Sequence, residues 1–146
     1  MLSCLAAMLG GGILVGAGPP SAIAAEPPAA IIVFDGSASM WGNPANEKKS
    51  KLALARDALK GALDKAPPGL RLGLVSFGHR RGGDCTDVET QVKAAAGTAG
   101  RINGILEKYN PRGRGPITLA LREAAKDLGP VTAPASVILI HDDPDN

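Results

Sequence analysis

The sequence lacks a surplus of charge of either sign. Its 146 residues include 16 Lys and Arg against 14 Asp and Glu, which gives a formal net charge of +2. Nucleic-acid-binding domains usually carry a marked basic surplus, so we expect no nucleic-acid partner. No repeat recurs at a fixed period, which argues against a repeat architecture. The length allows one domain at most.

Several catalytic motifs are absent as well. There is no Gly-x-Ser-x-Gly segment, so a hydrolase serine is unsupported, and no Gly-Lys-Ser/Thr segment, so a nucleotide-binding P-loop is unsupported. Gly113 and Gly115 share a Gly-x-Gly pattern, but no predicted strand precedes it, as a dinucleotide fingerprint would require. These absences predict that the chain is not an enzyme.

The first segment has no charged side chain. Its middle, Leu5 to Val15, is apolar and Gly-rich but too short for a confident membrane span. The small residues Ala22 and Ala24 fit cleavage by signal peptidase after Ala24. We therefore expect a signal peptide over residues 1–24, a short linker over 25–28 and a bacterial protein that is exported to the periplasm or beyond. No Lys or Arg precedes the apolar run, so retention as a membrane anchor is the alternative.

The two cysteines have different prospects. Cys4 would leave with the signal peptide, and Cys85 would then stand alone in a compartment that permits disulfides. Such an isolated thiol suggests a partner that is missing from the sequence. The alternative is a tolerated free cysteine on a loop.

The remaining sequence alternates apolar runs with helical patterns. Buried strands are predicted at 29–34, 70–77 and 136–140, a short edge strand at 88–92, and helices from Glu47 up to Pro67, around 102–109 and around 121–128. Strands alternating with helices predict an α/β fold, with an open, doubly wound, mostly parallel sheet and helices on both faces. The sequence stops soon after the run at 136–140. We therefore expect the domain, residues 29–146, to be incomplete, with its C-terminal strands missing and the last strand exposing apolar surface.

Oxygen-bearing side chains gather where ligands bind in such sheets, beyond the carboxyl ends of the strands. Asp35, Ser37 and Ser39 follow the first strand, Asp142 follows the last, and Thr118 stands at the start of a helix. Carboxylates and hydroxyls suit Mg²⁺, Mn²⁺ or Ca²⁺ better than Zn²⁺.

This pattern resembles the metal-ion-dependent adhesion site of the von Willebrand factor type A (VWA) family. That site has Asp-x-Ser-x-Ser after the first strand, a Thr before a helix and an Asp after a central strand, and the resemblance covers about residues 29–142. Trp41-Gly42 and the Gly-His-Arg-Arg segment at 78–81 are similar to exported bacterial members. Asp143 departs from the pattern, because the family usually has Gly there.

The resemblance implies a Rossmann-like VWA fold and a set of cation ligands. Ser37 and Ser39 would bind Mg²⁺, or Mn²⁺ or Ca²⁺, directly. Thr118 would bind it directly or through water, and Asp35 and Asp142 mostly through water. Neutral hydroxyls leave much of the ion's charge unquenched, so an open coordination position attracts an acidic side chain. The implied function is a cation-dependent, adhesion-type module that captures an acidic residue of a protein partner, with membrane contact only if the leader is retained.

Other interpretations of these residues stay open. The enzyme alternative is metal-assisted phosphoryl transfer with Asp35 as nucleophile, although that chemistry usually has a second carboxylate where this chain has Ser37. The blandest alternative is a strand-ending turn whose serines cap the next helix.

The neighbouring loops leave further alternatives. Trp41 would cover the metal loop, contact a partner or simply pack on the surface. A basic rim that steers acidic partners, or else ordinary solvated loop charge, would come from Arg80, Arg81, Arg112 and Arg114. His79 and His141 are expected to be ordinary loop or strand-end residues. The resemblance loosely supports a second Cys shortly after Asn146 that would join Cys85 and clip two loops together.

Overall fold

One four-stranded sheet organises the protein in the computed structural model, which describes residues 26–130 and 132–142. The strands are β1 (Ala29–Asp35), β2 (Arg71–Phe77), β3 (Val88–Ala95) and β4 (Ala135–Ile140), and they lie in the order β3-β2-β1-β4. β1 is parallel to both β2 and β4, whereas β3 is antiparallel to β2. The predicted mostly parallel sheet is therefore confirmed. The predicted leader and Asp143 lie outside the described residues.

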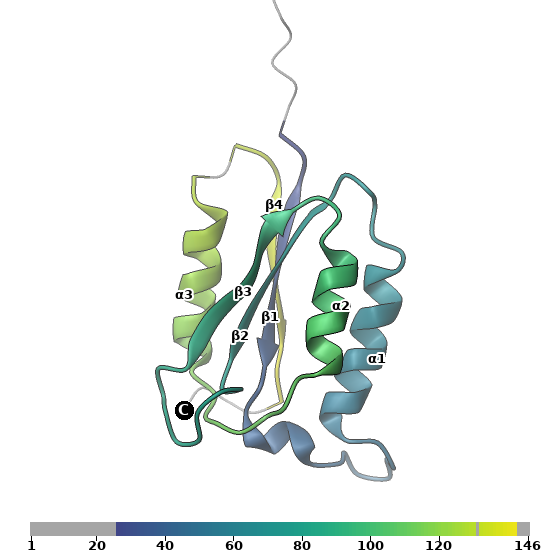
Figure 1. Ribbon diagram of the computed structural model, residues 1–146, viewed down its shortest axis with the longest axis vertical. Coiled ribbons are helices and arrows are strands. Elements are labelled where there is room, and N and C mark those ends of the chain that lie inside the picture. Colours follow the sequence, from purple (N-terminus) through teal and green to yellow (C-terminus); the bar gives the residue numbers. More distant parts are fainter. Residues whose placement is uncertain (1–25, 131, 143–146) are drawn as a thin grey trace, which may run out of the picture.

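Helices cover both faces of this sheet, as the sequence predicted. α1 (Lys51–Leu63) and α2 (Ala99–Glu107) lie on one side, and α3 (Ile117–Leu128) lies on the other (Figure 1). A short 3₁₀ helix, η1 (Ala38–Trp41), follows β1. Among the described residues, no helix combines the length and the apolar character needed to cross a membrane.

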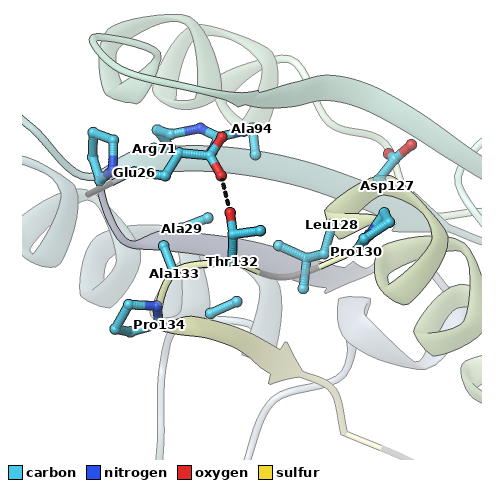
Figure 2. Close-up of a pocket in the computed structure, with 12 residues that line it drawn as sticks. Glu26, Ala29, Arg71, Ala94, Asp127, Leu128, Pro130, Thr132, Ala133 and Pro134 are labelled. Atoms are coloured by element: carbon cyan, nitrogen blue, oxygen red, sulfur yellow. Dashed lines mark hydrogen bonds and ion pairs between the residues drawn. The ribbon is translucent and has the colours of Figure 1, made fainter. Parts of the chain in front are cut away.

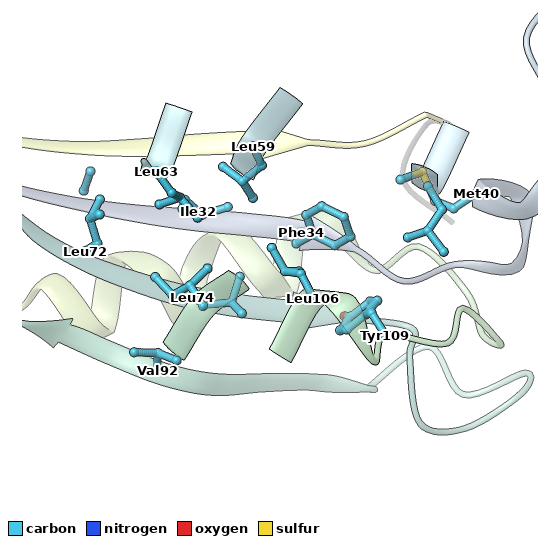
Figure 3. Packing of buried hydrophobic residues seen from close by; sticks show 13 residues of the cluster. Ile32, Phe34, Met40, Leu59, Leu63, Leu72, Leu74, Val92, Leu106 and Tyr109 are labelled. Carbon is cyan, nitrogen blue, oxygen red and sulfur yellow. The ribbon is translucent and has the colours of Figure 1, made fainter. Parts of the chain in front are cut away.

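Each face of β1 contributes to its own hydrophobic cluster. Ile32 and Phe34 pack with Leu59 of α1 and Leu106 of α2 (Figure 3). The intervening residues, Ile31 and Val33, pack on the opposite face with Ile117, Ala120 and Ala124 of α3. Successive side chains of a strand point to opposite faces, so a strand covered on both sides needs an unbroken apolar run. This burial fixes β1 at the centre of the domain and holds Asp35 at its end.

Several predicted boundaries were wrong by a few residues. α1 begins at Lys51 rather than Glu47, because the Ser50 side chain accepts the Ala53 N–H at 3.2 Å and caps the helix there. β3 continues to Ala95, and α2 spans Ala99–Glu107. Thr118 lies in the first turn of α3, at the start of a helix as predicted.

β4 exposes apolar side chains, as expected from the sequence. Within the described residues it pairs only with β1, and Val137 and Ile138 are 38% and 45% exposed. The predicted strand is confirmed, but in this part of the chain it is not buried on both faces. Among the described residues, one edge of β4 has no pairing strand. The side chains of β4 are therefore only partly covered.

Candidate metal centre

The turn after β1 is closely packed, and a glycine makes it possible. The N–H of Gly36 donates to the Phe77 carbonyl at 2.7 Å. A Cβ at position 36 would lie 2.6 Å from that carbonyl oxygen and 2.7 Å from both the His79 Cβ and a Tyr109 ring carbon. No side chain fits there, so the Asp-Gly-Ser sequence lets β1 end directly against the end of β2. Asp35 and Ser37 are held on either side of this contact.

Four of the five predicted ligands meet at this edge of the sheet. Asp35 Oδ1 accepts the Ser37 N–H at 2.7 Å, and the hydroxyls of Ser37 and Ser39 are hydrogen-bonded at 2.8 Å. The Ser39 hydroxyl donates to Asp142 Oδ1 at 2.9 Å, across 103 residues of sequence. Asp142 arrives here because β4 runs parallel to β1 and the two strands end at the same edge. A continuous row of oxygen atoms results.

Water has little access to the carboxylates in this row. Asp35 is 1% exposed and the Asp142 side chain 7%. Burial raises the pKa of Asp35 above its usual range and the charge of Asp142 acts in the same direction, while hydrogen bonds from Ser37 oppose the shift. Two neighbouring carboxylates with so little water are stabilised by a positive charge placed between or beside them.

Thr118, the fifth predicted ligand, follows a segment around Gly113 that is hydrogen-bonded to the serine motif. The Ala38 N–H donates to the Gly113 carbonyl at 3.1 Å, and Ser37 forms an isolated β-bridge with Gly113. Thr118 is exposed in the first turn of α3. The segment before α3 is thus placed against the motif, and the role of Thr118 as a ligand stays a prediction.

Lys51 is a site residue that the sequence analysis missed. Its Nζ lies 2.6 Å from Asp142 Oδ2, and its backbone N–H donates to the Gly42 carbonyl at 2.9 Å. One signal was available in the sequence. A lysine at the first position of a helix opposes the helix dipole, so its charge is expected to be stabilised by something else.

The loop from Gly78 to Asp87 is organised around one buried carboxylate. Asp87 accepts the backbone N–H groups of Arg80 and Arg81 at 2.8 and 3.1 Å and the Arg80 Nε at 2.7 Å. Burial disfavours the charge of Asp87, but these donors outweigh it, and the pKa of Asp87 lies below its usual range. Arg80 therefore acts inside the loop rather than as a free rim charge. Cys85 is exposed on the same loop.

Two other arginines of the loops lie beside the serine motif. Arg112 and Arg114 are exposed and line a shallow hollow together with Ser37 and Ser39. Trp41 stands nearby with its Nε1–H donating to the Pro111 carbonyl at 3.0 Å, although its residue is 52% exposed. Its indole is thus oriented by the protein while much of it faces solvent.

His79 lies in the loop after β2, as predicted, and neighbouring side chains hold its ring. Its Nε2 lies 3.1 Å from Glu89 and 2.8 Å from the Gln91 side chain, and its ring stacks on Tyr109 with centroids 4.9 Å apart. Burial lowers the pKa of His79, so its neutral form is favoured.

The donor chemistry of the site fits a hard divalent cation. The donors brought together are serine hydroxyls and aspartate carboxylates, the oxygen ligands that Mg²⁺, Mn²⁺ and Ca²⁺ prefer. Across residues 26–130 and 132–142, no group of three or more His, Cys, Asp and Glu side chains could hold a metal ion. A site built from only two carboxylates must rely on the hydroxyls.

A second hollow lies at the opposite end of the strands, where β1, β2 and β4 begin (Figure 2). Glu26 accepts hydrogen bonds from Arg71 and Thr132 there, each at 2.6 Å. These contacts tie the residues before β1 and β4 to the start of β2. They serve the packing of the sheet and bring no additional oxygen ligands to the candidate site.

The fold and this site define an open α/β domain with hydroxyl and carboxylate groups at the carboxyl ends of its parallel strands. No family model matches the chain, and no curated protein matches it. Solved structures do. The vWF domain of the type V pili tip protein Mfa5 from Porphyromonas gingivalis is 22% identical with a TM-score of 0.60, over 83% of this chain and 39% of that one.

Two further structures give a comparable match. BatB from Bacteroides thetaiotaomicron is 20% identical with a TM-score of 0.61, over 76% of this chain and 51% of that one. The PilB minor pilin from Streptococcus sanguinis is 20% identical with a TM-score of 0.60, over 86% of this chain and 31% of that one. The chain thus spans about half or less of these proteins. The described part has a von Willebrand factor type A-like fold, as the sequence resemblance implied.

The phosphoryl-transfer alternative has little support in the geometry. A nucleophilic carboxylate must reach the phosphorus atom from an accessible surface, yet Asp35 is 1% exposed and accepts the Ser37 N–H. Position 37 carries a hydroxyl instead of the second carboxylate that such chemistry usually has. The arrangement is better suited to holding an ion than to attacking a phosphate.

Proposed function

We propose that this protein is a divalent-cation-dependent binding module that captures an acidic side chain of a partner protein. Asp35, Ser37, Ser39, Thr118 and Asp142 would hold Mg²⁺, or Mn²⁺ or Ca²⁺ in its place. The cation would leave one coordination position for a carboxylate oxygen of the partner. The protein binds and does not catalyse in this proposal.

The observation that carries the proposal is the hydrogen bond between Ser39 and Asp142. At 2.9 Å it joins two segments 103 residues apart, on the strand ends where an α/β sheet binds ligands. If the serines only capped the helix after the turn, no contact with Asp142 at the end of β4 would be needed. In η1, moreover, the Ser37 side chain makes no capping hydrogen bond.

The surface around this row of oxygens suits an acidic partner. Arg112 and Arg114 border the same hollow as the two serines, and their charges attract carboxylates and raise the rate of encounter. Trp41 adds an exposed ring that is fixed by Pro111. Exposed aromatic and arginine side chains are the kinds most often found at the energetic centres of protein interfaces.

The structural neighbours agree with a role in protein contact. Mfa5 is described as a pilus tip protein and PilB as a minor pilin. Contacts of this kind are made outside the cytoplasm, which also agrees with the expected export of this chain.

The test is a titration with Mn²⁺, a spectroscopic substitute for Mg²⁺, followed by electron paramagnetic resonance of the free ion. We expect Ser39→Ala to weaken Mn²⁺ binding by about tenfold or more, because one direct ligand is lost. Ser136→Ala is the matched control, since Ser136 is an exposed serine near the start of β4, beside Ala30 of β1. Capture of a glutamate-rich peptide should then require Mn²⁺ and be reversed by EDTA. Equal Mn²⁺ binding by both variants, or capture that survives EDTA, would count against the proposal.

A further inference from the structure

Lys51 reaches the candidate site from the first turn of α1. Its backbone N–H donates a hydrogen bond to the Gly42 carbonyl. Its side chain passes close to Gly42, since the Lys51 Cε lies 3.9 Å from the position that a Cβ on Gly42 would take. Its Nζ contacts Asp142 Oδ2 at 2.6 Å, while the other oxygen of the same carboxylate accepts the Ser39 hydroxyl. A single carboxylate is therefore shared between an ammonium group and a predicted cation ligand.

This is an unfavourable place for a lysine unless the carboxylate is part of the arrangement. The positive end of a helix dipole repels an ammonium at the first helical position, and α1 has no acidic residue in its first turn to offset it. The side chain is also only 33% exposed. The 7% exposed carboxylate of Asp142 opposes this repulsion, which makes the pair an organised feature rather than a chance surface contact.

From this geometry we infer that Lys51 is a built-in counter-charge that weakens cation binding and strengthens the attraction of the loaded site for a carboxylate. The inference rests on the proposed function. Among the described residues, the charges of Asp35, Asp142 and Lys51 sum to one net negative charge. An incoming divalent cation must tolerate the ammonium nearby or displace it from Asp142, and either event opposes binding.

The same charge favours the partner. With Lys51 present, a bound divalent cation leaves the site positive, and a carboxylate from the partner restores neutrality. Without Lys51, Asp35 and Asp142 neutralise the cation, so the carboxylate of a partner would be attracted less strongly, chiefly by the more exposed charges of Arg112 and Arg114. Cation and carboxylate should therefore bind cooperatively in the native chain. Because the coupling is reciprocal, each ligand raises the affinity for the other by the same factor.

The experiment compares the full chain with Lys51→Met, which keeps the length of the side chain and removes its charge. Mn²⁺ binding is followed by electron paramagnetic resonance, with and without acetate as the carboxylate probe. We expect Lys51→Met to bind Mn²⁺ about tenfold more tightly and to lose most of the enhancement that acetate produces in the native chain.

Two control variants separate the local charge from other effects. Lys51→Arg keeps the positive charge and should behave as the native chain. Lys49→Met changes the net charge equally, but Lys49 pairs at 2.6 Å with Asp57 instead of Asp142, so it should also leave binding unchanged. Circular dichroism tests whether each variant is folded. If Lys51→Met does not fold, Lys51→Gln provides a second neutral side chain.

The outcomes distinguish this inference from the proposed function. If the native chain binds Mn²⁺ and the folded neutral variants bind it equally or more weakly, the role of Lys51 is wrong while the cation site stands. If neither the native chain nor the neutral variants bind at millimolar Mn²⁺, the proposed function fails and the inference fails with it. Binding by the neutral variants alone would overturn cation dependence in the native chain, and with it the cooperative capture of a carboxylate that the inference assigns to Lys51.

Discussion

Replacing Asp87 with Asn should destabilise the protein strongly, because the carboxylate meets donors at both of its oxygens. Oδ2 accepts the N–H groups of Arg80 and Arg81, and Oδ1 accepts the Arg80 Nε. An amide has only one acceptor oxygen. In either orientation its NH₂ group would face at least one of these donors inside a fully buried site.

The size of the effect follows from these contacts. Hydrogen bonds to a charged group contribute about 1.5–3 kcal/mol each, and leaving a buried group unsatisfied adds a similar penalty. The Arg80 side chain is 39% exposed and can turn toward water, which limits the loss. We expect Asp87→Asn to lower the free energy of unfolding by about 3 kcal/mol and the midpoint of thermal unfolding by roughly 10 °C.

The pH dependence gives a second, independent check. The pKa of Asp87 is lowered in the folded protein, so its contribution is fully present above the ordinary aspartate pKa and is lost as pH falls through the lower folded value. The difference in stability between the native chain and Asp87→Asn should therefore be constant near neutral pH and shrink below about pH 4.

Urea unfolding monitored by circular dichroism measures both quantities. The control is Asp57→Asn, since Asp57 forms an exposed ion pair with Lys49 and its replacement should have no measurable effect. Equal stability of Asp87→Asn and the native chain at pH 7 would refute the assignment of Asp87 as the organiser of the loop. So would a difference that does not change between pH 7 and pH 3.

Two further predictions concern packing, and urea unfolding tests both. Gly78 has φ +66° and a Cβ there would lie 2.2 Å from the Arg114 carbonyl, so Gly78→Ala should cost about 3 kcal/mol or more, whereas Gly83→Ala, with φ +76° and open space, should cost about 1 kcal/mol. Similar losses for the two alanines would show that the contact with Arg114 is unimportant. Leu74→Ala should cost about 3 kcal/mol because Leu74 is fully buried, while Leu121→Ala on the exposed side of α3 should cost under about 1 kcal/mol. If both leucines proved equally dispensable, the contribution of Leu74 to the hydrophobic cluster beneath α1 and α2 would be in question.

The sequence could predict much of the fold because periodicity reports burial. The unbroken apolar run before Asp35 marked a strand covered on both faces, and the structure shows helices on both sides of β1. Helix limits were less predictable. The start of α1 depends on a hydrogen bond from the Ala53 N–H to the Ser50 side chain. Sequence alone does not distinguish this N-terminus from others a few residues away.

The candidate site was partly predictable for a different reason. Parallel strands end at one edge of a sheet, so Asp35, Ser37, Ser39 and Asp142 were expected to meet once their strands were recognised, and they do. The order of the strands, the 2.9 Å contact between Ser39 and Asp142 and the burial of both carboxylates depend on how β1 and β4 pair.

The sequence by itself determined the α/β class, the oxygen chemistry of the site and the strand ends that carry it, because these follow from local pattern and residue type. Only the tertiary structure decided that Lys51 shares the carboxylate of Asp142 and that Arg80 is bound to Asp87 instead of facing a partner. Asp87 is only seven residues from Arg80 and Asp142 is 91 residues from Lys51, so distance along the sequence does not identify the partner of a long charged side chain. Such partners are selected by proximity and burial in the folded chain, which no local pattern specifies.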